Sequence, residues 1–376
     1  MSATPLHTLH AAGQSVWLDY IDREMLGNGD LERRIAEDEL TGMTSNPTIF
    51  EKALAEGTSY DAQLAEMGAG LSAGEAFERV ATDDVRRACD IFRPVYDATN
   101  GHDGFVSLEV SPGVAHDTEG TIAEAHRLWS EVYRPNVMIK VPGTDQAMEA
   151  IRRLTADGVN VNITLLFSVD AHRRVIDAYL AGLEERAAAG KPIAHIASVA
   201  SFFVSRVDSK VDKQLETIAA AGGEGADQAR ALMGHAAIAN AKLAYRLFTS
   251  SFSGARWEAL SALGAQLQRP LWASTSTKNP AYRDVLYVEQ LIGPHTVNTL
   301  PPATLEAFRD HGVVERTVDR DVDGAVRTLA QLEAVGVSLD RVTDELLTEG
   351  LASFQKSFES LLGGLERKRE MVLADR

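Results

Sequence analysis

Residues 137–167 read VMIKVPGTDQAMEAIRRLTADGVNVNITLLF, which is a short apolar run, a longer mixed segment and a second apolar run. The runs Val137–Val141 and Val159–Phe167 have the length and the β-branched content of buried strands. Apolar residues of the segment between them, Asp145–Thr155, recur at helical spacing: Ala147, Ile151 and Leu154. The stretch therefore predicts a strand–helix–strand unit, which is the repeating element of a parallel sheet.

The same alternation extends over roughly residues 14–300 and predicts eight strands. They are Ser15–Ile21, Leu40–Ser45, Phe105–Ser111, Val137–Val141, Val159–Phe167, His195–Phe203, Pro270–Ser274 and Thr296–Leu300. Residues 51–104 leave room for two or three helices, and a helical tail covers roughly 323–373. We expect an α/β fold: a (β/α)8 TIM barrel with extra helices after strand two and a helical C-terminal tail, forming one domain over 1–376. The tail either covers the barrel or forms an oligomer interface.

The composition limits the classes of partner that the protein is expected to bind. The chain of 376 residues has 54 acidic and 37 basic side chains, and its formal net charge of −17 argues against nucleic acid or an anionic membrane as partner. The one cysteine, Cys89, excludes an internal disulfide and a thiolate metal cluster. Because neither a signal peptide nor an 18-residue apolar run is visible, we expect a cytoplasmic protein.

No HExxH motif or glycine-rich nucleotide motif occurs, so we expect no metal and no cofactor. Association into an oligomer is compatible with the sequence.

Five of the expected strands carry polar residues on one face near their carboxyl ends, although both faces of a barrel strand are normally apolar. These residues are Asp19; Ser107, Glu109 and Ser111; Lys140; Asn160, Asn162 and Thr164; and Ser201. One such residue alone is usually a helix cap or a solvated strand end. Five polar faces at the same end of a barrel indicate an active site, because barrel sites form there and buried polar groups need partners.

Lys140 and Glu109 are the chemical centre of this set. A lysine removed from water more readily reaches its neutral form, which attacks a ketone to give a Schiff base. The iminium then accepts electrons as a neighbouring C–C bond breaks. That reaction needs groups that move protons, and Glu109 and Asp19 are suitable carboxylates.

At these residues the chain resembles the transaldolase family. The segments that carry the resemblance are Trp17–Asp19, Thr44–Phe50, Ser107–Val110, Ile139–Thr144, Asn162–Ser168 and Ser201–Arg206. They follow the family in order and spacing over about residues 14–300, and the long insertion and tail are similar to those of its longer-chain branch.

The resemblance implies a cofactor-free transfer of a dihydroxyacetone unit between sugar phosphates in the non-oxidative pentose phosphate pathway. The donor would be sedoheptulose 7-phosphate or fructose 6-phosphate, and the acceptor glyceraldehyde 3-phosphate or erythrose 4-phosphate. Lys140 would form the Schiff base, on strand four as in the family. Asp19 would exchange the proton of the hydroxyl beside the bond that breaks. Glu109 would act through a water held by Thr164 during imine formation.

The resemblance also implies the substrate contacts. Asn46 and Asn162 would hydrogen-bond the dihydroxyacetone hydroxyls, assisted by Ser201, while Arg206 beside Phe203 would bind phosphate. One departure concerns strand seven, which ends at Ser274. Many family members have an arginine two residues further on, where this chain has Ser276; Lys278 would replace it without bidentate geometry.

Two alternatives remain at this stage. A related Schiff-base aldolase would release free dihydroxyacetone, but such family members are shorter and differ at the positions of Glu109 and Phe203. A phosphosugar-binding barrel without catalysis would lack Lys140 or Glu109, and both are present.

Overall fold

The protein forms a closed barrel of eight parallel strands that pair in chain order, in a computed structural model that describes residues 4–55, 57–68 and 70–374. The strands are β1 (Gln14–Asp19), β2 (Leu40–Thr44), β3 (Phe105–Glu109), β4 (Val137–Pro142), β5 (Val161–Leu166), β6 (Ser198–Phe203), β7 (Gln268–Ala273) and β8 (Thr296–Leu300). All eight lie at the expected positions, which confirms the (β/α)8 barrel. The outermost residues of the expected domain, 1–3 and 375–376, lie outside the described residues. Strand β6 begins three residues later than expected, because Ile196 N–H closes a turn onto the Ile193 carbonyl.

The barrel has an apolar interior below its polar end. Alternate strand residues form a buried inner cluster: Trp17, Phe105, Met138, Ala197, Val199, Leu271, Ala273 and Val297. Gly42 on β2 makes room for this cluster, since a Cβ atom there would lie 2.6 Å from the Trp17 ring. The opposite strand faces pack against the helices in a larger core. Both faces are therefore largely apolar, except where polar residues such as Ser107, Asn162 and Thr164 lie on the inward faces.

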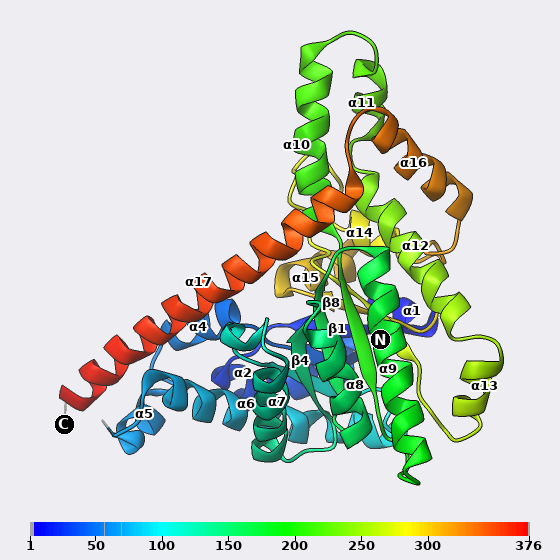
Figure 1. Ribbon diagram of the computed structural model, residues 1–376. Helices are drawn as coiled ribbons and strands as arrows, with labels where there is room; N and C mark the ends of the chain where they lie inside the picture. The colour runs from blue at the N-terminus through cyan, green and yellow to red at the C-terminus, as the bar shows by residue number, and fades with distance from the viewer. Residues whose placement is uncertain (1–3, 56, 69, 375–376) are drawn as a thin grey trace.

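Helices surround the barrel (Figure 1). Helix α1 (Pro5–Ala11) precedes β1. Between the strands and after β8 lie α2 (Arg23–Asn28), α3 (Asp30–Asp38), α7 (Thr118–Val132), α8 (Ala147–Asp157), α9 (Val169–Ala188), α10 (Ser205–Ala221), α11 (Ala226–Leu232), α12 (Ala236–Ser251), α13 (Ala255–Ser261), α14 (Leu286–Glu289) and α15 (Pro302–His311). The extra helices after β2 are α4 (Pro47–Ala55), α5 (Asp61–Met67) and α6 (Ala73–Ala98), as expected. Ser72 and Glu75 form a capping box that starts α6. No helix in the described part of the chain is long and apolar enough to cross a membrane.

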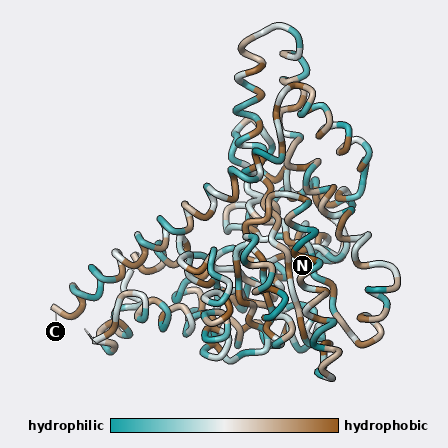
Figure 2. The backbone as a smooth tube through the Cα atoms, in the orientation of Figure 1, coloured by the Kyte–Doolittle hydropathy of each residue, from teal (hydrophilic) through white to brown (hydrophobic). Residues whose placement is uncertain are grey.

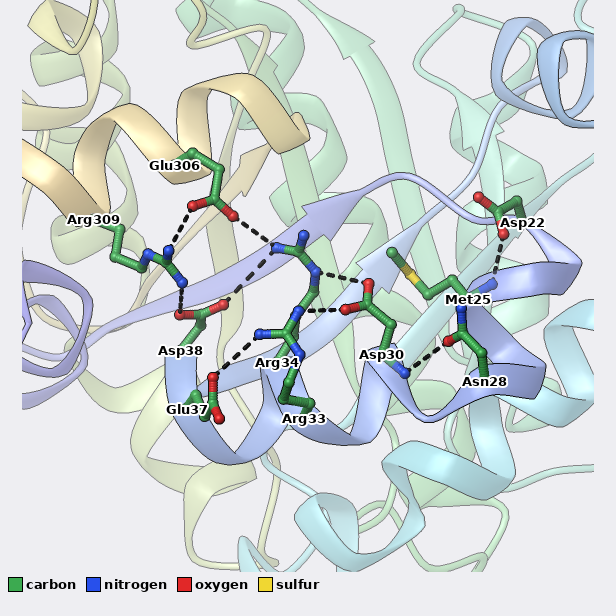
Figure 3. A network of polar contacts seen from close by, with 10 residues as sticks. All are labelled: Asp22, Met25, Asn28, Asp30, Arg33, Arg34, Glu37, Asp38, Glu306 and Arg309. Atoms are coloured by element: carbon green, nitrogen blue, oxygen red, sulfur yellow. Dashed lines mark hydrogen bonds and ion pairs between the residues drawn. The ribbon is translucent and has the colours of Figure 1, made fainter. Parts of the chain in front are cut away.

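A network of ion pairs joins the first and last units of the barrel on its outside (Figure 3). Arg34 of α3 donates to Asp30 and to Glu306 of α15, both at 3.1 Å. Arg309 of α15 donates to the buried Asp38 at 3.3 Å. Because β1 pairs with β8 beneath these helices, the network lies over the seam at which the barrel closes.

The tail consists of α16 (Val322–Ala334) and α17 (Leu339–Ala374), and α17 lies over the insertion helices α4, α5 and α6 (Figure 1). Polar and apolar residues alternate along α17, whereas apolar residues concentrate around the barrel (Figure 2). Gly350 lets α17 approach the end of β5, because a Cβ atom there would lie 3.1 Å from Leu165 Cδ2. Lys368 donates to the carbonyl groups of Leu54 and Gly57 at 2.8 and 2.7 Å. The tail therefore packs against this chain's own barrel end.

Candidate active site

A cavity of about 660 Å³ opens at the carboxyl ends of the strands. It is lined by the predicted residues with one exception, Asn162: Asp19, Asn46, Glu109, Lys140, Thr164, Ser201, Phe203, Arg206, Ser274, Ser276 and Lys278. These residues are distant in sequence and come from separate βα units. The structure thus brings side chains from these polar faces together at the end of the barrel where such sites form. Ser111 and Asn160, noted on the same faces, lie outside the cavity: Ser111 bonds to Glu124, and Asn160 to the Val137 carbonyl.

Lys140 lies at the base of this cavity. The strand register places it directly beside Glu109 on β3 and Asn162 on β5. Its Nζ atom donates to Glu109 Oε2 at 3.1 Å and to the Ser45 carbonyl oxygen at 3.3 Å. The two side chains are only 10% and 8% exposed. The amine is therefore held in one place and has little contact with bulk water.

Glu109 is electrostatically unusual. Burial raises the pKa of its carboxyl group; the Lys140 ammonium opposes that rise, and the Asp19 carboxylate adds to it. A carboxylate with a raised pKa beside an ammonium group can accept the ammonium proton and leave a neutral amine. The pair is thus suited to generate a nucleophilic lysine.

Asp19 is the last residue of β1, and its neighbour on β2 fixes its orientation. The Thr44 hydroxyl donates to Asp19 Oδ1 at 2.8 Å, and the two residues are register partners. The carboxylate lines the cavity and also affects the electrostatics of Glu109. Two carboxylates from different strands therefore line the same cavity as Lys140.

Asn162 is completely buried beneath the cavity. The Ser201 hydroxyl donates to Asn162 Oδ1 at 2.7 Å, and Asn162 Nδ2 donates to the Ser107 hydroxyl at 3.0 Å. Both ends of the amide are fixed by these contacts. In this arrangement Asn162 orients Ser201, which does line the cavity.

Asn46 is both a helix cap and a cavity-lining residue, the two roles that a polar residue at a strand end can have. Its Oδ1 atom accepts the Ile49 N–H at 3.1 Å, so the residue caps α4. It also lines the cavity. The cap leaves the amide nitrogen as a donor toward a ligand.

Two cations, Arg206 and Lys278, also line the cavity. Arg206 is the second residue of α10, and its guanidinium carbon lies 5.2 Å from the centre of the Phe203 ring. Lys278, in the loop after β7, donates to the Ser276 hydroxyl at 2.7 Å. Burial lowers the pKa of Arg206; partial burial and the Arg206 charge lower that of Lys278. In the described residues no carboxylate lies within 4.0 Å of either cation.

Several lining residues escaped the sequence analysis: Lys52, Thr299, Gly350, Ser353, Phe354 and Ser357. Lys52 belongs to α4, and the last four belong to α17. Thr299 lies on β8, where no motif marks it. The others have no motif of their own, because their position depends on how the insertion and the tail pack. Among the described residues no group of three or more His, Cys, Asp or Glu side chains is placed to hold a metal ion.

Comparison with known proteins agrees with this geometry. A family model described as Transaldolase/Fructose-6-phosphate aldolase matches residues 16–365. A protein of Thermobifida fusca named Transaldolase is 51% identical over 361 residues, covering 96% of both chains. A Transaldolase of a Parafrankia species is 50% identical over 360 residues, covering 95% of this chain and 96% of the relative. Transaldolase 2 of a Nostoc species is 46% identical over 378 residues, covering 99% of both chains. The chain belongs to the transaldolase/fructose-6-phosphate aldolase family.

Proposed function

We propose that this protein is a transaldolase that transfers a dihydroxyacetone unit from a ketose phosphate to an aldose phosphate through a Schiff base on Lys140. Sedoheptulose 7-phosphate and fructose 6-phosphate are the proposed donors, and glyceraldehyde 3-phosphate and erythrose 4-phosphate the acceptors, in the non-oxidative pentose phosphate pathway. The observation that carries the proposal is the buried Lys140–Glu109 pair in a cavity that the cations Arg206 and Lys278 also line.

Imine formation begins when Glu109 takes a proton from the Lys140 ammonium group. The neutral amine attacks the C2 ketone, and the resulting carbinolamine loses its hydroxyl as water, with the proton supplied by the carboxyl group. Thr164 is buried and lines the cavity beside these groups, where its hydroxyl can hold the water that relays the proton.

Bond cleavage follows on the iminium. Asp19 accepts the proton of the C4 hydroxyl, the C3–C4 bond breaks, and its electron pair moves toward the iminium nitrogen to give an enamine. The aldose phosphate leaves. The enamine carbon then attacks the aldehyde of the acceptor, Asp19 returns the proton, and hydrolysis of the new iminium releases the ketose product. Every atom of the donor appears in the products, so the reaction needs no oxidant or cofactor.

The substrate would be oriented by contacts near the amine and by contacts to its phosphate group. Asn46 and Ser201 would hydrogen-bond hydroxyl groups near the amine; both line the cavity, and Asn162 accepts a hydrogen bond from the Ser201 hydroxyl. Arg206 offers two parallel N–H donors to phosphate, and Lys278 adds a point charge where the family more often has arginine.

Since α17 lines the same cavity, we also propose that barrel and tail act as one domain.

A coupled assay tests the proposal. Purified protein incubated with fructose 6-phosphate and erythrose 4-phosphate should form sedoheptulose 7-phosphate and glyceraldehyde 3-phosphate in equal amounts. Release of free dihydroxyacetone from fructose 6-phosphate alone at a comparable rate would indicate an aldolase. Binding without either product would indicate a barrel that has lost catalysis.

A further inference from the structure

Two buried carboxylates on α10 take no part in the chemistry described above. Asp208 and Asp212 lie one helical turn apart and are 1% and 6% exposed. Each makes the same pair of contacts. Asp208 accepts the Ala237 N–H at 2.7 Å and the Tyr287 hydroxyl at 2.9 Å. Asp212 accepts the Gly234 N–H at 2.9 Å and the Tyr282 hydroxyl at 2.7 Å.

These contacts join two segments that carry the cations of the cavity. Arg206 precedes Asp208 by two residues on α10, and Lys278 precedes Tyr282 by four residues in the segment after β7. Tyr287 lies in α14, at the far end of that segment. The paired carboxylates therefore fasten the Lys278 segment to the helix that presents Arg206.

The fit of Tyr282 shows that this connection is tight. Gly234 has a φ of +75°, and a Cβ atom there would lie 2.9 Å from Tyr282 Cζ. The tyrosine ring therefore packs directly on the glycine backbone, whose N–H faces Asp212. Tyr287 is fully buried on its own side of α10. The two hydroxyl groups are consequently held to a narrow range of positions.

The attachment of the Lys278 segment to α10 can hold Lys278 against repulsion by Arg206. Partial burial lowers the pKa of Lys278 and the Arg206 charge lowers it further, because like charges repel each other. The segment 274–285 forms neither helix nor strand, and its internal bonds, such as Thr277 Oγ1 to the Arg283 carbonyl at 2.9 Å, do not tie it to α10. A fixed attachment near Lys278 would keep the second cation in place before an anion enters, which reduces the ordering cost of binding.

We infer that Asp208 and Asp212, acting through Tyr287 and Tyr282, are positioning residues that hold Lys278 beside Arg206 and thereby preorganise the phosphate-binding end of the cavity. The inference rests on the proposed function, because it assumes that the substrate carries a phosphate. A merely structural role for the four residues predicts a change in stability alone. A positioning role predicts in addition a selective loss of affinity for phosphorylated substrates.

The experiment removes the two hydroxyl groups and keeps the rings. Tyr282→Phe/Tyr287→Phe should raise KM for fructose 6-phosphate roughly 5- to 20-fold and leave kcat within about twofold. The inhibition constant of inorganic phosphate should rise in parallel. For unphosphorylated fructose, kcat/KM should stay within about twofold. Tyr179→Phe is the matched control, since it also removes a buried hydroxyl, one bonded to the Ile196 and Gln266 carbonyls away from the cavity.

A conservative replacement gives a second measurement. Asp208→Asn keeps an oxygen for the Ala237 N–H and offers an amide to the Tyr287 hydroxyl, so its KM should stay close to that of wild type, whereas Asp208→Ala should resemble the tyrosine variant. Equal losses for fructose 6-phosphate and fructose, or a KM no different from that of Tyr179→Phe, would overturn the inference. Failure of the proposed function would be visible separately, as a wild-type protein without transfer activity.

Discussion

The Nζ atom of Lys140 lies 3.1 Å from Glu109 Oε2, and both side chains are almost entirely removed from solvent. A buried ion pair of this kind adds little to stability, because the cost of desolvating two charges is close to the gain from their attraction. The same burial raises the pKa of Glu109, which favours transfer of a proton to it from Lys140. The pair is therefore better explained by its chemistry than by its contribution to the fold.

Replacing each of the two carboxylates by its amide should block a different step of the reaction. Asp19→Asn should still form a Schiff base that borohydride can trap, with aldehyde release blocked, because only the cleavage step needs that base. Glu109→Gln should slow the appearance of the trapped species itself. The rates of trapping and of aldehyde release, measured side by side, separate the steps. Normal aldehyde release by Asp19→Asn would show that this residue is a structural strand end.

The two cations should contribute unequally to phosphate binding. Arg206→Ala should lower kcat/KM for fructose 6-phosphate by roughly 2–4 kcal/mol, since it removes a bidentate charged contact. Lys278→Ala should lower it by less, because an ammonium group gives a single contact without bidentate geometry. For unphosphorylated fructose both losses should be much smaller. An Arg206→Ala variant that loses equally with both sugars would place this arginine in a structural role.

The buried His172 should make the protein sensitive to acid. Neither ring nitrogen has a hydrogen-bond partner among the described residues, and burial lowers the pKa of His172 to about 3. The unfolded chain binds a proton near pH 6.5, whereas the folded chain does so only near pH 3. The free energy of unfolding therefore decreases as the pH falls from about 6.5 toward 3, by about 1.4 kcal/mol for each pH unit.

Replacement of this histidine by an apolar residue tests that account. His172→Leu should flatten the dependence of the unfolding free energy on pH between about 6 and 4, measured by urea denaturation. His102→Gln changes an exposed histidine and serves as control. An unchanged slope in His172→Leu would mean that other groups cause the acid sensitivity.

The barrel interior should not tolerate a side chain at position 42. Gly42→Ala would place a methyl group 2.6 Å from the Trp17 ring, so the inner cluster must shift, at a cost of about 1–3 kcal/mol. Gly27→Ala is the matched control: nothing lies within 4 Å of its Cβ position, and alanine favours the helix α2 that contains it. Thermal melting of the two variants should move in opposite directions. A Gly42→Ala protein as stable as wild type would contradict the packing described for the interior.

Much of the barrel could be predicted because its strands are short apolar runs, and period-two alternation singled out Lys140 and Glu109 as polar residues on an inward face. The sequence could not reveal the Ser45 carbonyl beside Lys140, since every residue has a carbonyl group. Phe354 and its neighbours on α17 form part of the cavity wall only because the tail packs back onto elements such as α4 and β5. These elements lie more than 150 residues earlier in the chain, so no local pattern could reveal the contact. The contact of Tyr282 with Asp212 likewise joins segments far apart, with no local pattern to mark it.

The most direct test of the central claim is the site of covalent labelling. Borohydride reduction in the presence of fructose 6-phosphate should attach a dihydroxyacetone-derived group to Lys140, found by mass spectrometry of the digested protein. Lys140→Ala should remain folded, take up no label and lose turnover. Lys52→Ala removes another lysine that lines the cavity and should still be labelled at Lys140. A label on a different lysine, or no label on an active wild-type protein, would contradict the account.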